Sequence, residues 1–198
     1  MGVNVLATPR VKTLLQKLEA WGLENDRVQT DRSRKMLNLE RETAELVRAL
    51  IVGWQPRRIL EIGTSNGYST IWLAASVGPG GSIISIERDA AKLELAKENL
   101  LHAEVLGHTE LRLGDATEIV ASLPGPFDVV FFDADRLSAP DQLALLLPKL
   151  SHRALLLADN VLSHPDEIAG YLAIVRALPE FEHVIVPVGK GLSIAHRS

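Results

Sequence analysis

Hydrophobic and polar residues alternate with a helical period over the N-terminal part of the chain. Thr8 and Pro9 form a typical helix cap and first helical residue. The apolar positions after them recur every three or four residues, at Val11, Leu14, Leu15, Leu18 and Trp21. Asn38 is suited to cap a second helix, whose apolar face comprises Leu39, Thr43, Leu46, Val47 and Leu50. The pattern predicts two amphipathic helices within residues 1–52.

The pattern changes at Arg57, where short β-rich apolar runs begin to alternate with helical segments. We expect strands at 58–62, 82–87, 110–115, 127–134 and 153–159, and helices at 68–77, 89–103, 116–123, 139–150 and 165–178. Continuous apolar strands bordered by helices are typical of a parallel sheet covered on both faces. Residues 183–197 instead contain two strands joined by Gly189-Lys190-Gly191, which predicts a hairpin and one antiparallel strand. The fold class is therefore α/β, in one domain over residues 1–198 with a core over 57–198.

Composition excludes several classes of protein. The 198 residues carry a net charge of −4 and no cysteine, which excludes disulfides, thiolate metal sites and a cysteine nucleophile. The N-terminal residues lack the basic start and apolar block of a secretion signal, and no apolar run reaches the ~18 residues of a membrane span. We expect a cytoplasmic protein without membrane contact.

A basic cluster, Asp26 to Lys35, is interpreted as a solvated connector rather than as an RNA footprint.

The stretch "LEIGTSNGYST", residues 60–70, reads as a strand, a glycine turn and the start of a helix. Gly63 and Gly67 permit a sharp bend and close approach to a ligand. A Walker loop requires Gly-Lys-Ser/Thr, and a dinucleotide fingerprint requires Gly-x-Gly, where this chain has Ser65. Glu61, two residues before the first glycine, repels a phosphate and suits an ammonium group or its bound water. These features predict a nucleoside ligand that carries a cation.

The ends of the next two predicted strands agree with such a ligand. Glu87 ends the second strand, where an acid in this architecture commonly binds both ribose hydroxyls. Asp115 follows the third strand and can accept a hydrogen bond from an adenine amine, while Ala116 leaves room for the ring. The alternative is that these acids cap helices or lie in solvated loops.

Five motifs together resemble those of the small S-adenosylmethionine-dependent O-methyltransferases related to catechol O-methyltransferase, O-methyltransferase family 3. The motifs are "EIGTSNGYST" at 61–70, "IE" at 86–87, "GDA" at 114–116, "FDVVFFDAD" at 127–135 and "ADNVL" at 158–162. The resemblance extends from about Met36 to the C-terminus. It implies a Rossmann-like class I methyltransferase fold, with a seven-stranded, mostly parallel sheet, an antiparallel last strand and helices on both faces. Relatives in this family are commonly homodimers.

The resemblance also implies where S-adenosylmethionine binds. The cofactor is expected over the turn from Gly63 to Gly67, with a divalent cation beside its sulfonium group. Met36 matches a position near the cofactor sulfur in the family, although methionine is equally suited to fill the core. The expected cofactor contacts are Met36, Glu61, Gly63, Thr64, Ser65, Gly67, Ser69, Glu87, Arg88, Gly114, Asp115, Ala116 and Asp133.

Three oxygen donors follow neighbouring predicted strands and can converge on a metal. Asp133 ends the fourth strand, and Asp159 and Asn160 end the fifth. Such a set suits Mg²⁺, or alternatively Ca²⁺ or Mn²⁺, with water or acceptor oxygens completing the shell. In the family that the chain resembles, these three positions bind the metal. The alternative is that Asp133 and Asp159 cap helices and Asn160 braces a turn.

The chain departs from the family after Asp135, where relatives have a lysine that serves as general base. This chain has Arg136, which stays protonated and cannot accept the proton of a substrate. Arg136 either holds an anionic group of the substrate by a bidentate contact or faces solvent at a helix start. His164 is a second candidate base, or else a loop residue before a helix that begins at Pro165.

The residues and the resemblance together predict a methyltransferase that uses S-adenosylmethionine and a divalent cation to methylate a hydroxyl of a small aromatic acceptor. Two alternatives remain open. The chain could modify a hydroxylated uridine in tRNA, with Arg27 to Lys35 and Arg57-Arg58 meeting phosphates. It could also be a module that binds S-adenosylmethionine without catalysis, because the family's lysine is missing.

Overall fold

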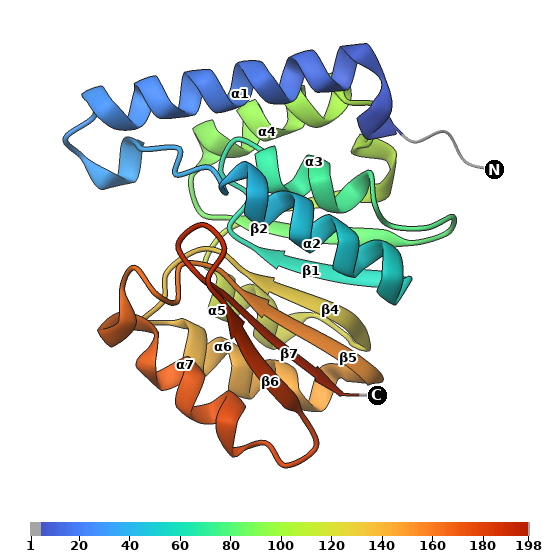
Figure 1. Ribbon diagram of the computed structural model, residues 1–198. Coiled ribbons are helices and arrows are strands. Elements are labelled where there is room, and N and C mark those ends of the chain that lie inside the picture. The colour runs from blue at the N-terminus through green and yellow to red at the C-terminus, as the bar shows by residue number, and fades with distance from the viewer. Residues whose placement is uncertain (1–4, 198) are drawn as a thin grey trace.

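The computed structural model describes residues 5–197 and has an α/β architecture. Residues 1–4 and 198 of the expected domain lie outside the described residues. The strands are β1 Arg58–Ile62, β2 Ser82–Glu87, β3 Thr109–Leu113, β4 Phe127–Phe132, β5 Leu150–Ala158, β6 Glu182–Val186 and β7 Leu192–Arg197. The helices are α1 Pro9–Val28, α2 Arg41–Trp54, α3 Tyr68–Ala74, α4 Ala90–His102, α5 Ala116–Ser122, α6 Ala139–Leu146 and α7 Pro165–Ala177 (Figure 1).

The strands form one seven-stranded sheet in the order β3-β2-β1-β4-β5-β7-β6. The first five strands along the chain are parallel, whereas β7 pairs antiparallel with both β5 and β6. The predicted hairpin and antiparallel strand are confirmed. Because β7 lies between β5 and β6, the turn that joins β6 to β7 comes to the carboxyl end of β5, where Ala158 pairs with Ser193.

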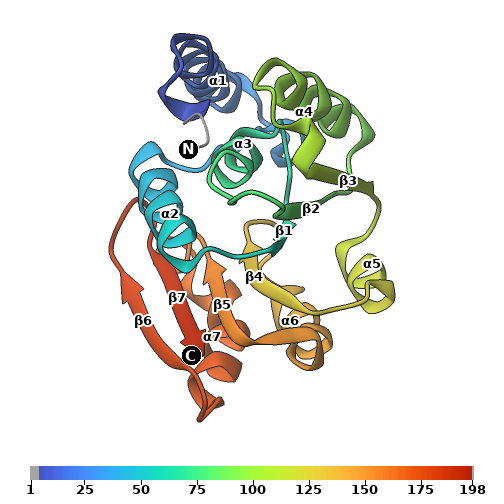
Figure 2. The same cartoon turned by 90° about the vertical axis from the view of Figure 1, so that its right-hand side faces the viewer.

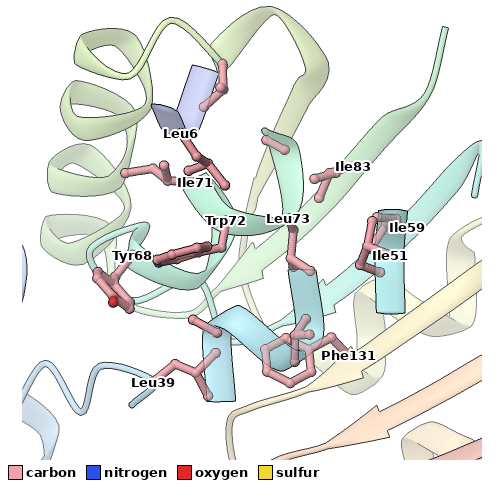
Figure 3. Packing of buried hydrophobic residues seen from close by; sticks show 14 of the residues in the cluster. Leu6, Leu39, Ile51, Ile59, Tyr68, Ile71, Trp72, Leu73, Ile83 and Phe131 are labelled. Atoms are coloured by element: carbon pink, nitrogen blue, oxygen red, sulfur yellow. The ribbon is translucent and has the colours of Figure 1, made fainter. Parts of the chain in front are cut away.

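Helices cover both faces of the sheet, as the apolar strands predict. Successive strand residues alternate between two cores: Ile59, Ile83 and Val129 face α1 to α4, whereas Leu60, Ile84 and Val130 face α5 to α7 (Figure 2). α3 contributes Tyr68, Trp72 and Leu73 to the first core (Figure 3). No helix within residues 5–197 is long and apolar enough to cross a membrane.

Three helix boundaries differ clearly from the sequence prediction, and one of them is the end of α3, which stops at Ala74 rather than at residue 77. α2 begins at Arg41 rather than after Asn38, and the Asn38 amide donates instead to the Leu18 carbonyl, 2.9 Å away. The helix predicted over 139–150 ends at Leu146, because Pro148 lacks the N–H that would continue it, and residues 147–149 form a 3₁₀ turn. Trp21, expected on the apolar face of α1, is 42% exposed, and Gly22 takes the buried position.

A polar network attaches the N-terminal helices to the core. The Tyr68 hydroxyl on α3 donates to Glu19 on α1 at 2.6 Å, and Arg41 on α2 also binds the Glu19 carboxylate, at 2.8 Å. Tyr68 is 1% exposed, so this hydroxyl depends on its protein partner. The network fixes α1 and α2 over the start of α3, which follows the glycine turn.

We expect Tyr68→Phe to lower the free energy of unfolding by about 1.5–3 kcal/mol, because the hydroxyl bonds a charged group. Tyr171→Phe is the matched control. Tyr171 is equally buried, and its hydroxyl has only a weak hydrogen bond with Ser193 rather than a bond to a charged group, so its loss should cost at most about 1 kcal/mol. Urea unfolding of both variants checks the difference, and equal losses would contradict the role given to the Glu19 contact.

Candidate functional site

The segments that follow β1, β2, β4 and β5 lie side by side because the strand ladder continues past the strand ends. The amide of Gly63 donates to Ile86 at 3.0 Å, and that of Asp133 donates to Ile62 at 2.9 Å. The amide of Asp159 donates to Phe132 at 3.0 Å. The carboxyl edge of a parallel sheet is where ligands bind in this architecture. The glycine turn and the predicted metal ligands therefore meet at one place.

The glycine turn is shaped by close packing as well as by backbone conformation. Gly63 has φ 108° and Gly67 has φ 85°, in the region that favours glycine. A Cβ at Gly63 would lie 2.3 Å from the carbonyl oxygen of Asp133, so no other residue fits there. The predicted sharp bend is confirmed, and Gly63 touches the segment that carries the predicted metal ligand.

Glu61 is fully buried beneath the turn. Its carboxylate accepts hydrogen bonds from the hydroxyls of Ser69 at 2.6 Å, Thr70 at 2.5 Å and Ser85 at 2.5 Å. Thr64 in turn lies 2.6 Å from the Ser85 hydroxyl. Burial raises the pKa of Glu61, and these hydroxyl donors oppose that rise. The carboxylate thus binds α3 and β2 and organises the turn from below, and its predicted interaction with an ammonium group or its bound water stays a prediction.

Glu87 and Asp115 keep part of their acceptor capacity. Glu87 accepts from the amides of Ser65, Arg88 and Asp89, at 2.8, 2.9 and 3.0 Å. A carboxylate has about four acceptor positions, so acceptor capacity remains for a ribose hydroxyl, and the contact with both hydroxyls stays a prediction. Asp115 lies directly before Ala116 and caps α5 with one carboxylate oxygen, as the helix-cap alternative predicted. Its second oxygen is available to accept a hydrogen bond from an amine. Gly114 precedes it with φ 146° and donates to the Glu87 carbonyl at 2.9 Å.

The segment before α2 is fastened over the glycine turn. Met36 is 7% exposed, and its amide donates to Asp26 at 2.7 Å. Its carbonyl accepts from the Ser65 hydroxyl at 2.7 Å, and Lys92 donates to the Lys35 carbonyl at 2.6 Å. Met36 is therefore both buried and next to the turn, so the two interpretations of this residue are compatible.

Asp133, Asp159 and Asn160 converge. The Asn160 amide nitrogen lies 2.7 Å from Asp159 Oδ2 and 3.5 Å from Asp133 Oδ1, and Asn160 has a left-handed φ of 65°. Ser138 and His164, rather than these aspartates, occupy the cap positions of α6 and α7, so the helix-cap alternative is wrong. No group of three or more His, Asp or Glu side chains within residues 5–197 is arranged to hold a metal. The Asn160 amide presents its nitrogen to the aspartates in this structure, so a metal site with three oxygen donors here would need the amide turned by half a rotation, and the metal stays a prediction.

The two aspartates are in an environment that suits a cation. Asp159 is 3% exposed, and its Oδ1 is buried without a hydrogen-bond partner within residues 5–197. Burial raises the pKa of Asp159 to about 7. Burial and the charge of Asp159 raise the pKa of Asp133 well above its ordinary value. Beside them lies a cavity of about 10 Å³, room for one water or ion.

Arg136 lines the same cavity and is 8% exposed. Its Nε and Nη2 both bind Glu167 Oε2 on α7, at 2.9 and 2.7 Å. The solvent-facing alternative is therefore wrong. The contact with a substrate anion stays a prediction, and Glu167 at present neutralises the guanidinium.

His164 directly precedes α7, which begins at Pro165 as predicted. Its Nδ1 lies 2.8 Å from the Ser163 hydroxyl. His164 does not line the cavity beside the aspartates. Its role as a base stays a prediction that this geometry does not strengthen.

Sequence reasoning missed Glu40 and Lys190. Lys190 Nζ lies 2.5 Å from Glu40 Oε1, and both charges act on the aspartates: Glu40 raises and Lys190 lowers the pKa of Asp159. The sequence pattern predicts only a hairpin at the Gly-Lys-Gly turn. The signal that could have placed it was the topology, because an antiparallel strand beside β5 brings its preceding turn to the end of that strand.

The basic residues considered for RNA do not form one surface. Residues 27–35 precede Met36 at the carboxyl end of β1, whereas Arg57 and Arg58 lie at its amino end. A wider cleft of about 330 Å³ also lies at the amino ends of β1 to β3, lined by Arg58, Ser82 and His108 among others. Arg57, Arg58 and this cleft are separated from the aspartates by the length of the strands.

The sheet order, the antiparallel strand and the glycine turn define the Rossmann-like fold of the methyltransferases. The O-methyltransferase family model matches residues 19–197, and the chain belongs to this family. A catechol O-methyltransferase from Mycobacterium tuberculosis is 38% identical over 109 residues, which are 54% of this chain and 50% of the relative. The chain thus matches about half the length of that curated relative.

Solved structures agree over nearly the whole chain. A candidate O-methyltransferase from Klebsiella pneumoniae matches with a TM-score of 0.81 and 25% identity, over 97% of this chain and 91% of that one. The O-methyltransferase TomG from Streptomyces achromogenes, solved in complex with S-adenosylmethionine, matches with a TM-score of 0.78 and 25% identity, over 96% and 90%. The predicted fold and family are confirmed.

The raised pKa of Asp159 predicts a pH-dependent stability. The folded protein holds a proton that the unfolded chain loses near pH 4, so the free energy of unfolding should fall as pH rises from about 4 to about 7. The fall should be on the order of 2–4 kcal/mol. Asp159→Asn should remove most of it, whereas Asp166→Asn, on the exposed first turn of α7, should not. Urea unfolding in EDTA across this range measures it; a rise in all three proteins would contradict the electrostatics described.

Proposed function

We propose that this protein binds S-adenosylmethionine and methylates a hydroxyl of a small aromatic acceptor, with a divalent cation held by Asp133, Asp159 and Asn160. The observation that carries the proposal is the contact between the glycine turn and the acid cluster, because Gly63 packs on the Asp133 carbonyl. When bound, S-adenosylmethionine supplies a methyl group on a sulfonium centre, and the cation supplies positive charge that favours the ionised form of an acceptor hydroxyl.

The residues of the chain provide positioning and electrostatics. Glu61 and its hydroxyl donors hold the turn rigid, and Glu87 and Asp115 offer acceptors along the same edge. The unpartnered oxygen of Asp159 and the raised pKa of both aspartates favour a bound cation, since its charge would relieve their repulsion. Fixed geometry between acceptor and methyl group then accounts for much of the rate.

Exposed leucines at the same edge favour a ring-bearing acceptor. Leu37, Leu137 and Leu162 are 43%, 69% and 51% exposed, and each belongs to a different loop beside a site residue. Apolar side chains next to a few polar groups are typical of small-molecule sites. The separation of Arg57 and Arg58 from the other basic residues gives no support to the tRNA alternative.

Titration calorimetry tests the proposal. S-adenosylhomocysteine should bind the wild type, and Mg²⁺ and catechol should then bind together. Asp159→Asn should keep the first event and lose the second, and should lower methyl transfer to catechol by roughly 100-fold or more, because a catalytic cation contributes several kcal/mol. Asp166→Asn is the matched control and should behave as the wild type.

The remaining outcomes separate the parts of the proposal. Cofactor binding without any effect of Mg²⁺ would remove the metal from it. Cofactor binding without transfer to any hydroxylated aromatic would favour the non-catalytic module. Failure to bind S-adenosylhomocysteine at all would overturn it.

A further inference from the structure

An ion pair between the N-terminal and C-terminal parts of the chain lies beside the acid cluster. Lys190 sits at the turn between β6 and β7, and Glu40 directly precedes α2. Their charged atoms are 2.5 Å apart, with side-chain exposures of 47% for Lys190 and 27% for Glu40. The pair therefore borders the solvent, in contrast to Arg136, whose side chain is 9% exposed.

The turn that carries Lys190 is locked against the loop that carries Asp159 and Asn160. The amides of Val161 and Leu162 donate to the carbonyls of Gly191 and Lys190, at 3.1 and 2.9 Å. A Cβ at Gly191 would lie 2.4 Å from Leu162 Cγ, so the leucine side chain lies on this glycine. Lys190 and the exposed Leu162 are thus neighbours, and together with Glu40 they form the solvent-facing border of the acid cluster, called the rim of the site below.

Glu40 is held in a well-defined place as well. A Cβ at Gly189 would lie 3.0 Å from Glu40 Oε2, and this oxygen is buried without a hydrogen-bond partner within residues 5–197. The carboxylate therefore lies against the turn that carries Lys190. Glu40 raises and Lys190 lowers the pKa of both Asp133 and Asp159, so the pair is within electrostatic range of the cluster.

Lys190 has unused capacity to bind an anion. An ammonium group has three N–H donors, and the structure gives it one acceptor, Glu40 Oε1. Arg136, the other cation near the aspartates, binds Glu167 and is almost inaccessible. Lys190 is therefore the cation best placed to meet an oxygen that enters from solvent.

We propose that Lys190 binds the anionic oxygen of the acceptor, with the ring against Leu162, and that Glu40 is the positioning residue that holds the ammonium group at the rim. This inference rests on the proposed function and names the group that the acceptor must present, an ionised ring hydroxyl. It assigns a binding role to the charge of the lysine and requires no proton transfer from it.

The test is a spectroscopic titration of 4-nitrocatechol, whose ionised form is coloured, bound to the full chain with Mg²⁺ and S-adenosylhomocysteine. Lys190→Gln should weaken binding of the anion roughly tenfold, as expected for the loss of a half-exposed charged hydrogen bond, and should raise the pKa of the bound probe. Lys190→Arg should retain most of the affinity. Lys97→Gln, which removes an ion-paired lysine on α4, should change nothing.

Glu40→Gln distinguishes binding from a merely structural role. It keeps an oxygen for Lys190 but removes a negative charge, so binding of the anion should tighten by roughly threefold. Opposite changes in Lys190→Gln and Glu40→Gln support the proposal. Weakening in both, or no change in Lys190→Gln, would overturn it while the proposed function stands. Failure of the wild type to bind 4-nitrocatechol after binding S-adenosylhomocysteine would overturn both.

Discussion

The rest of the site depends on one buried carboxylate. Glu61 has no exposed surface, and an unpaired charge there would be very costly. Hydroxyls from α3 and β2 supply its hydrogen bonds. Because the buried carboxylate needs these bonds, it joins the end of β1 to both α3 and β2. The turn above is thereby fixed against the Asp133 carbonyl. Glu61, which the sequence predicts as a ligand contact, thus also stabilises the turn over which the ligand is expected to bind.

Charge is distributed unevenly at the carboxyl edge of the sheet. Glu40, Asp133 and Asp159 gather there, and only Lys190 and Arg136 oppose them among the described neighbours that influence Asp159. Arg136 is neutralised by Glu167 and buried, so the edge has a net attraction for cations. A sulfonium cofactor and a divalent ion both match this field. The same field disfavours a diphosphate, in agreement with the absence of a phosphate-binding motif.

Much of the fold could be predicted because the strands are apolar on both faces and are separated by clear helical periods. The acids at the strand ends could be placed for the same reason, since parallel strands bring them to one edge. What failed depended on tertiary partners. The Asn38 amide donates to a carbonyl on α1 instead of capping α2. The hydroxyl partners of Glu61 on α3 and β2 could not be foreseen either, and its contact with an ammonium group stays a prediction. The contact between Glu40 and Lys190 could not be predicted, because 150 positions of the printed sequence separate the two residues. They meet only because β7 inserts between β5 and β6.

The position of β7 between β5 and β6 has a consequence for folding. β5 has a partner on that side only after residues 192–197 have docked, although all the other strands precede β7 along the chain. The ion pair beside the site joins residues near position 40 to residues near 190, so its formation closes a long loop of chain and carries the corresponding entropy cost. The core and the site therefore depend on contacts of very different separation along the chain, and a change in the last strand would disturb the site more than the centre of the sheet.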